Sequence, residues 1–98
     1  MRLHCAMMTM NELKDLVENV TNILPYVDSV TIVDGGSVGD TITYLRNWSQ
    51  EEPKIRFFIH PWEDNFPKQR NNYLDHINEI AEQGDWIFVF DPDEFFMT

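Results

Sequence analysis

Apolar residues follow two alternating patterns along the chain. Short, mostly apolar runs at 3–8, 30–33, 55–59 and 86–90 are typical of strands, and the stretches between them carry apolar residues at helical spacing. The apolar faces of these helices are Leu13, Leu16, Val17, Val20, Ile23 and Leu24; Ile42, Leu45 and Trp48; and Phe66, Tyr73, Leu74, Ile77, Ile80 and Ala81. The pattern therefore predicts the order βαβαβαβ.

Residues that start or stop helices stand near the ends of the three amphipathic stretches. Asn11 and Asp40 precede the first two stretches, and we expect both to act as N-caps. Pro25 and Gly84 are expected to stop the first and third helices. The second helix is expected to end near Trp48, and residues 50–53 are expected to form a polar connector.

The last apolar run, 86–90, is bounded by carboxylates on both sides. A continuous run of this length predicts a strand that is buried on both faces. Such a strand would deliver Asp91, Asp93 and Glu94 to one point where the chain leaves the sheet. Pro92 lacks a backbone donor, so it would end strand pairing there and turn Asp93 away from the sheet.

Strands that alternate with helices predict an α/β domain with a mainly parallel four-stranded sheet and helices on both faces. In such a sheet the ligand crevice lies beyond the carboxyl ends of the strands, where strand order reverses. Acidic, small and aromatic residues follow the four predicted strands, namely Asn11 and Glu12; Asp34, Gly35, Gly36 and Ser37; His60, Trp62 and Asp64; and Asp91, Asp93 and Glu94. This set predicts a nucleotide site with a metal.

The composition excludes several classes of protein. A formal charge of -10, from seventeen acids against seven bases, argues against a general nucleic-acid binder. No segment approaches the apolar length of a membrane span. Cys5 is the only cysteine, so no intramolecular disulfide can form, and we expect it to pack as a small apolar residue. The N-terminus lacks the pattern of a signal peptide, so a cytoplasmic location is expected.

The order and spacing of the motifs resemble family 2 glycosyltransferases of the GT-A fold. The motifs are Asn-Glu at 11–12, Val-Asp-Gly-Gly-Ser at 33–37, Trp-x-Asp-Asn-Phe at 62–66, Gln-Arg-Asn at 69–71, and Asp-Trp-Ile-Phe-Val-Phe-Asp-Pro-Asp-Glu-Phe at 85–95. The resemblance covers nearly the whole chain and matches the nucleotide-binding N-terminal half of such enzymes. It implies a single domain, 1–98, with a Rossmann-like GT-A core.

The resemblance also implies roles for individual residues. In the Asp-x-Asp motif, Asp91 would lie near the ribose and Asp93 would reach a Mn²⁺ or Mg²⁺ ion that bridges the diphosphate. Asp34, with Gly35 beside it, would lie near the nucleobase or ribose. Arg70 would clamp a phosphate or a ribose-side carboxylate through paired hydrogen bonds.

Several residues of the motifs and of the predicted strand ends also have a purely structural interpretation. Asp34 could cap its own loop, and Arg70 could form a surface ion pair. The usual Ser-Thr-Asp-Gly-Thr continuation is replaced here by Ser-Val-Gly-Asp-Thr at 37–41, which favours a capping role for Asp40. Glu12 could favour the helix dipole instead of facing the base, and His60 is more typical of a loop residue than of a ligand.

The predicted function is metal-dependent transfer of a sugar from a nucleotide diphosphate sugar, most simply a UDP-hexose, to an unknown hydroxyl acceptor or to water. The family's acceptor half is expected to be missing, so Glu94 and Asp64 are the nearby candidates for the catalytic base, beside Asp93 at the metal. The alternative is a nucleotide-sugar-binding module without turnover, or the donor half of an assembly. Apolar surface left at the last strand predicts a homo-oligomer.

Overall fold

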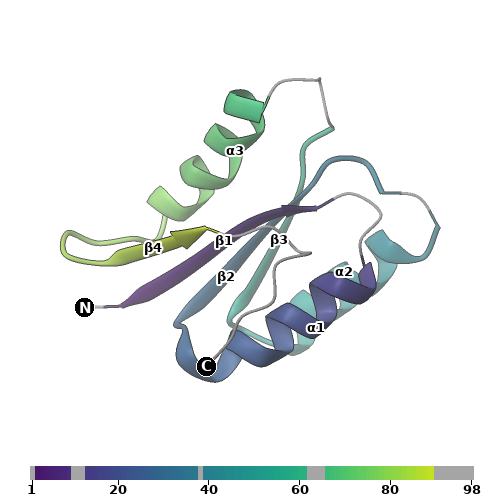
Figure 1. Ribbon diagram of the computed structural model, residues 1–98, viewed down its shortest axis with the longest axis horizontal. Coiled ribbons are helices and arrows are strands. Elements are labelled where there is room, and N and C mark those ends of the chain that lie inside the picture. Colours follow the sequence, from purple (N-terminus) through teal and green to yellow (C-terminus); the bar gives the residue numbers. More distant parts are fainter. Residues whose placement is uncertain (1, 10–12, 38, 62–65, 90–98) are drawn as a thin grey trace.

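The computed structural model describes residues 2–9, 13–37, 39–61 and 66–89. The elements in chain order are β1 (Leu3–Thr9), α1 (Leu13–Ile23), the 3₁₀ turn η1 (Leu24–Tyr26), β2 (Ser29–Asp34), α2 (Thr41–Glu51), β3 (Ile55–Ile59), α3 (Phe66–Asn78) and β4 (Trp86–Val89), as drawn in Figure 1. The predicted order βαβαβαβ is confirmed.

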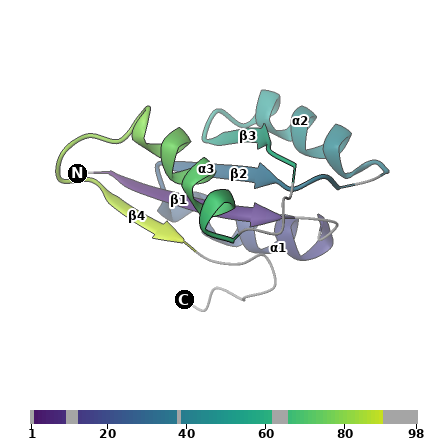
Figure 2. The same ribbon diagram turned by 90° about the horizontal axis from the view of Figure 1, so that it is seen from above.

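All four strands belong to one parallel sheet with the order β3-β2-β1-β4. The chain adds β2 and β3 on one side of β1 and then returns to place β4 on the other side (Figure 2). The strand order therefore reverses between β1 and β4, and the carboxyl ends of these two strands flank the switch point at which open α/β sheets bind ligands.

Two cores of unequal size lie on the two faces of the sheet. Helices α1 and α2 cover one face and α3 covers the other (Figure 1). The larger core contains the buried residues Cys5, Met7, Leu16, Val20, Ile23, Val27, Val30, Ile32, Leu45 and Ile55. The smaller core, under α3, contains Ala6, Val33, Tyr73 and Ile77. The α/β class with helices on both faces is thus confirmed, and Cys5 packs in the core as expected.

The prediction that the last strand is buried on both faces is wrong. All four residues of β4 are exposed, with Trp86 at 64% and Val89 at 45%. The reason is its place in the sheet, because among the described strands β4 pairs with β1 alone and forms an edge. An apolar run predicts a strand from its composition, but which faces are covered depends on the neighbours that the fold supplies.

Two helix ends also differ from the prediction. Asp40 occupies the N-cap position of α2, but its side chain makes no capping hydrogen bond; its carbonyl accepts the Tyr44 N–H at 2.9 Å. Helix α2 continues to Glu51, so the first two residues of the expected polar connector, Gln50 and Glu51, are helical. Helix α3 ends at Asn78, although Ala81 still packs against the smaller core. Asn11, the other expected cap, lies outside the described residues.

A polar network closes the amino edge of the sheet. The Asp85 carboxylate accepts hydrogen bonds from the backbone N–H groups of Arg2 and Glu82, each at 3.0 Å, and from His4 Nε2 at 2.9 Å. The same imidazole contacts the Ser29 hydroxyl through Nδ1 at 2.7 Å. Because Nε2 of a neutral ring donates to the carboxylate, Nδ1 accepts from Ser29. The network therefore joins the starts of β1, β2 and β4.

This network predicts acid-sensitive stability. The hydrogen bond from the Glu82 N–H, followed by those from His4 and the Arg2 N–H, lowers the pKa of Asp85 below its usual value. A carboxyl group whose pKa is lower in the folded protein stabilises the fold above its unfolded pKa of about 3.9, and this stabilisation is lost as the pH falls below that value. Urea unfolding between neutral pH and pH 3 measures the loss.

Asp85→Asn is expected to reduce stability at neutral pH, because the amide NH₂ presents a donor to groups that themselves donate. The free energy of unfolding should also fall less steeply as the pH is lowered, because the titrating carboxyl group is gone. Asp75→Asn is the matched control, since Asp75 is an exposed acid on α3. If both variants lose stability with acid as steeply as the parent, Asp85 is not the responsible group.

Candidate functional site

Asp34 is the best-placed acidic residue among those that the structure describes. It ends β2 and is completely buried, at 0% exposure. Its Oδ1 accepts hydrogen bonds from the backbone N–H groups of Gly36 and Ser37, each at 2.7 Å. Its Oδ2 is also buried and has no hydrogen-bond partner in the described part of the chain. The carboxylate therefore caps its own loop with one oxygen and leaves the other, buried oxygen without a partner among the described residues.

Thr9 ends β1 directly beside Asp34. The two residues are register partners in adjacent parallel strands, so their side chains lie on the same face of the sheet. Thr9 is 4% exposed, and its hydroxyl Oγ1 has no hydrogen-bond partner among residues 2–9, 13–37, 39–61 and 66–89. Buried polar atoms are nearly always paired in folded proteins. Thr9 and Asp34 therefore place two buried oxygens without a described partner side by side at the carboxyl edge, and this pair is the candidate site.

The backbone around Asp34 is held from both sides. Its carbonyl accepts the His60 N–H from the end of β3 at 2.9 Å, and the next residue, Gly35, donates its N–H to the Thr9 carbonyl at 2.8 Å. Gly36 has φ +116, a left-handed value that favours glycine, and no atom lies within 4 Å of where its Cβ would be. Gly36 thus allows the chain to turn tightly directly after the buried carboxylate.

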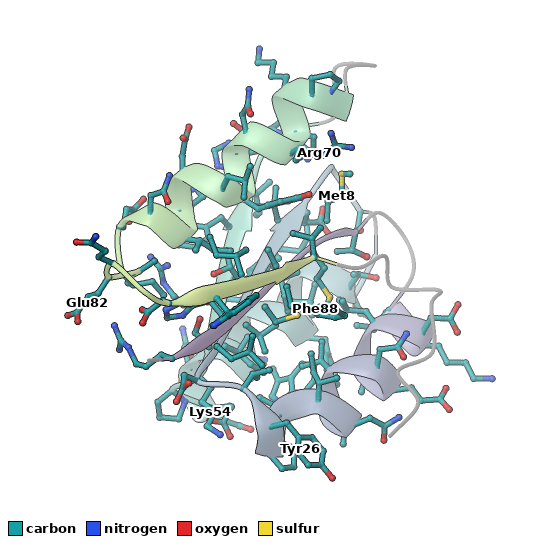
Figure 3. The ribbon with its side chains drawn as sticks, turned by 60° about the vertical axis from the view of Figure 1, so that its left-hand side comes forward. Met8, Tyr26, Lys54, Arg70, Glu82 and Phe88 are labelled. Carbon is teal, nitrogen blue, oxygen red and sulfur yellow. The ribbon has the colours of Figure 1, made fainter. Side chains whose placement is uncertain are left out.

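Arg70 is an exposed residue in the first turns of α3. Within the described residues its guanidinium forms no hydrogen bond or ion pair, so the surface ion pair considered above has no partner there. Figure 3 shows Arg70 on the same side of α3 as Met8, which lies next to the end of β1 and packs beneath the helix. The arginine is therefore available to an anion at the carboxyl edge.

His60 has a partner that the sequence did not reveal. Its Nε2 lies 2.8 Å from Nε2 of His76 on α3, and its carbonyl oxygen accepts a hydrogen bond from the Gln69 amide at 2.8 Å. Burial of the ring and, after it, the nearby charge of His76 lower the pKa of His60. Helical periodicity offered no signal for this pairing, because the two histidines belong to separate elements.

Most of the other predicted site residues cannot be located. Asn11, Glu12, Trp62, Asp64, Asp91, Asp93 and Glu94 lie outside the described residues. Within residues 2–9, 13–37, 39–61 and 66–89, no group of three His, Cys, Asp or Glu side chains could hold a metal ion. The structure thus brings Asp34, Gly35 and the newly found Thr9 together. It leaves the predicted metal ligands untested.

Comparison with models of protein families shows to which family the chain belongs. A family model described as Glycosyl transferase family 2 matches residues 5–98. The chain belongs to this family. The match agrees with the resemblance seen in the motifs and extends over the parallel sheet and all three helices. No curated protein matches the chain.

Membership in glycosyl transferase family 2 supports a role in glycosyl transfer or nucleotide-sugar binding, with a nucleotide-sugar donor as the partner. Members of this family commonly use divalent metals. No helix among the described residues has the length and apolar character needed to cross a membrane.

Proposed function

We propose that this domain binds a UDP-hexose at the carboxyl edge of its sheet and takes part in metal-dependent transfer of the hexose to an acceptor hydroxyl or to water. The observation that carries the proposal is the pair of buried, unpartnered oxygens on Asp34 and Thr9, next to the switch point between β1 and β4. Family membership supplies the donor class.

The chemistry of the two oxygens suits a uridine. An ionised carboxylate only accepts hydrogen bonds, whereas a hydroxyl both donates and accepts. Uracil carries one ring N–H between two carbonyl groups, so Asp34 Oδ2 can accept its N–H or a ribose hydroxyl while Thr9 Oγ1 donates to a carbonyl. Because the Gly36 and Ser37 amides bind Oδ1, Oδ2 is the carboxylate oxygen that would accept from the ligand once the ligand reaches this buried position.

The diphosphate end of the donor would be handled by charged residues. Asp93, with Asp91, provides hard carboxylate oxygens of the kind that hold Mn²⁺ or Mg²⁺, and a bound ion neutralises charge on the departing diphosphate. Arg70 is proposed to bind a phosphate oxygen from the α3 side. Asn11 and Glu12 are proposed to line the nucleotide, and Glu94 or Asp64 to take the proton of the acceptor.

The test is isothermal titration of the full chain with UDP and UDP-hexoses, with and without Mn²⁺. We expect saturable binding that Mn²⁺ strengthens and that Asp93→Ala weakens to the level seen without the ion. An affinity for UDP that is the same with and without Mn²⁺, and the same in Asp93→Ala, would contradict the metal role. Release of free hexose or glycosylated product, sensitive to Asp93→Ala, would distinguish turnover from the alternative of a binding module.

We also propose that two copies of the chain associate along β4. This strand exposes four apolar side chains, Trp86, Ile87, Phe88 and Val89, and it is the outermost strand on its side of the described sheet. A second copy meeting it around a two-fold axis would bury the same surface on both chains. Light scattering is expected to give a dimer, and replacing Val89 by Lys should yield a monomer. A monomer at high concentration for the parent chain contradicts the proposal.

A further inference from the structure

A compact cluster of polar and aromatic side chains links the end of β3 to α3, apart from Asp34 and Thr9. It consists of Arg56, Phe58, His60, His76 and Glu79. The rings of His60 and His76 meet through their Nε2 atoms at 2.8 Å, with ring centroids 5.0 Å apart. The two imidazoles therefore point their outer nitrogens at each other and away from the backbone.

The ring of His76 is held by Phe58 and Glu79. It stacks on Phe58 with centroids 3.6 Å apart and an interplanar angle of 5°. Its Nδ1 lies 2.9 Å from Glu79 Oε1, and Glu79 is held in turn by Arg56, whose Nη2 lies 3.3 Å from Oε2. Because Nδ1–H donates to the carboxylate, Nε2 of the neutral ring carries a lone pair. This nitrogen therefore faces His60 as an acceptor.

His60 is fixed through its backbone. Its carbonyl accepts from the amide of Gln69, a side chain that is almost fully buried, and its N–H bonds to the Asp34 carbonyl. The His60 ring is the donor to His76 in the absence of an ion, and a shift of its proton to Nδ1 makes its Nε2 a second lone pair.

We propose that His60 and His76 form a two-imidazole site for a transition-metal ion such as Zn²⁺, Ni²⁺ or Cu²⁺. A tetrahedral zinc bound at about 2.0–2.1 Å separates two ligand nitrogens by about 3.3 Å. The two Nε2 atoms lie 2.8 Å apart and point at each other, so the His60 ring must swing until its lone pair meets that of His76 at the ion, which also widens the gap by about 0.5 Å. Water fills the remaining positions.

The surroundings resemble those of established metal-binding histidines. Such residues almost always donate their second ring N–H to a carboxylate or carbonyl, which orients the ring and raises its basicity. The His76–Glu79 contact has this arrangement. Imidazole selects late transition metals, whereas Mn²⁺ and Mg²⁺ prefer oxygen ligands. The site is therefore chemically distinct from the carboxylate site proposed for the donor diphosphate.

The test is a calorimetric titration of the metal-free full chain with Zn²⁺ and with Ni²⁺. We expect saturable binding that His60→Gln and His76→Gln each abolish. Glu79→Gln keeps both ligands but loses the charged partner, so the affinity should fall about 10- to 100-fold. His60→Gln is the main variant because it leaves the stacking and carboxylate contacts of His76 in place. Thermal unfolding without metal checks that each variant is folded.

Two further results decide the proposal. Bound Cu²⁺ should show nitrogen couplings in its electron paramagnetic resonance spectrum, and these should disappear in His60→Gln. Asp93→Ala should retain Zn²⁺ binding whether or not it loses UDP, which separates this site from the donor site. Unchanged Zn²⁺ binding in His60→Gln, or no saturable binding to the parent chain, overturns the proposal and leaves a hydrogen-bonded histidine pair.

Discussion

Asp34→Asn is expected to weaken UDP binding about 10- to 100-fold, the cost of a lost hydrogen bond to a charged group. The substitution is nearly isosteric. An asparagine carbonyl can still accept the N–H groups of Gly36 and Ser37, so the loop keeps its cap. Its NH₂ group replaces Oδ2, the unpartnered acceptor, with a donor. Calorimetry with UDP measures the loss, and urea unfolding checks the fold.

Two threonines supply a matched control for this prediction. Thr9 and Thr31 both bury a hydroxyl without a partner, but only Thr9 stands at the carboxyl edge beside Asp34, whereas Thr31 lies within β2. Thr9→Val should weaken UDP binding about 2- to 10-fold, and Thr31→Val should leave it unchanged. Equal effects of the two substitutions, or full affinity in Asp34→Asn, would remove the support for a uridine site here.

Ile77→Ala is expected to destabilise the domain by about 2–5 kcal/mol. The residue is 0% exposed and is one of four buried residues in the core beneath α3. A chain of 98 residues has a total stability of about 5–15 kcal/mol, so the cavity removes a large share of it. The small core has few other contacts with which to hold α3. Urea unfolding monitored by circular dichroism measures the change.

Asn78→Ala is the control for this cavity. Asn78 is exposed and follows Ile77 on the same helix, so its substitution should change the stability by less than about 0.5 kcal/mol. If Ile77→Ala lowers the free energy of unfolding by no more than Asn78→Ala does, α3 is not held by the smaller core. Because α3 carries Arg70, Gln69 and His76, its docking also controls two of the proposed sites.

Much of the fold could be predicted because buried parallel strands and amphipathic helices leave strong local patterns. The bounds of β3, Ile55–Ile59, agree with the apolar run, and β2 exceeds its predicted run by one residue at each end. Strand β4 was placed correctly but its exposure was not, because coverage by helices and neighbouring strands is a tertiary property. Helix ends depended on weak signals, as Asp40 illustrates.

The site was predictable only in part. Asp34 was found from its loop motif, and the structure adds that one oxygen caps the loop while the other stays unpaired. Thr9 was missed because a threonine at the end of an apolar run carries no chemical signal of its own. Its significance comes from the register that sets it beside Asp34. His76 was missed for the same reason, since its partner belongs to another element.

Buried polar groups at the two edges of the sheet differ in whether they are hydrogen-bonded. At the amino edge, His4, Ser29 and Asp85 satisfy one another, whereas at the carboxyl edge Thr9 and Asp34 keep oxygens without partners. Strand β1 connects the two edges, since it begins beside the satisfied network and ends at Thr9. Stability and affinity can therefore be engineered separately in this domain, by substitutions at opposite ends of the same strand.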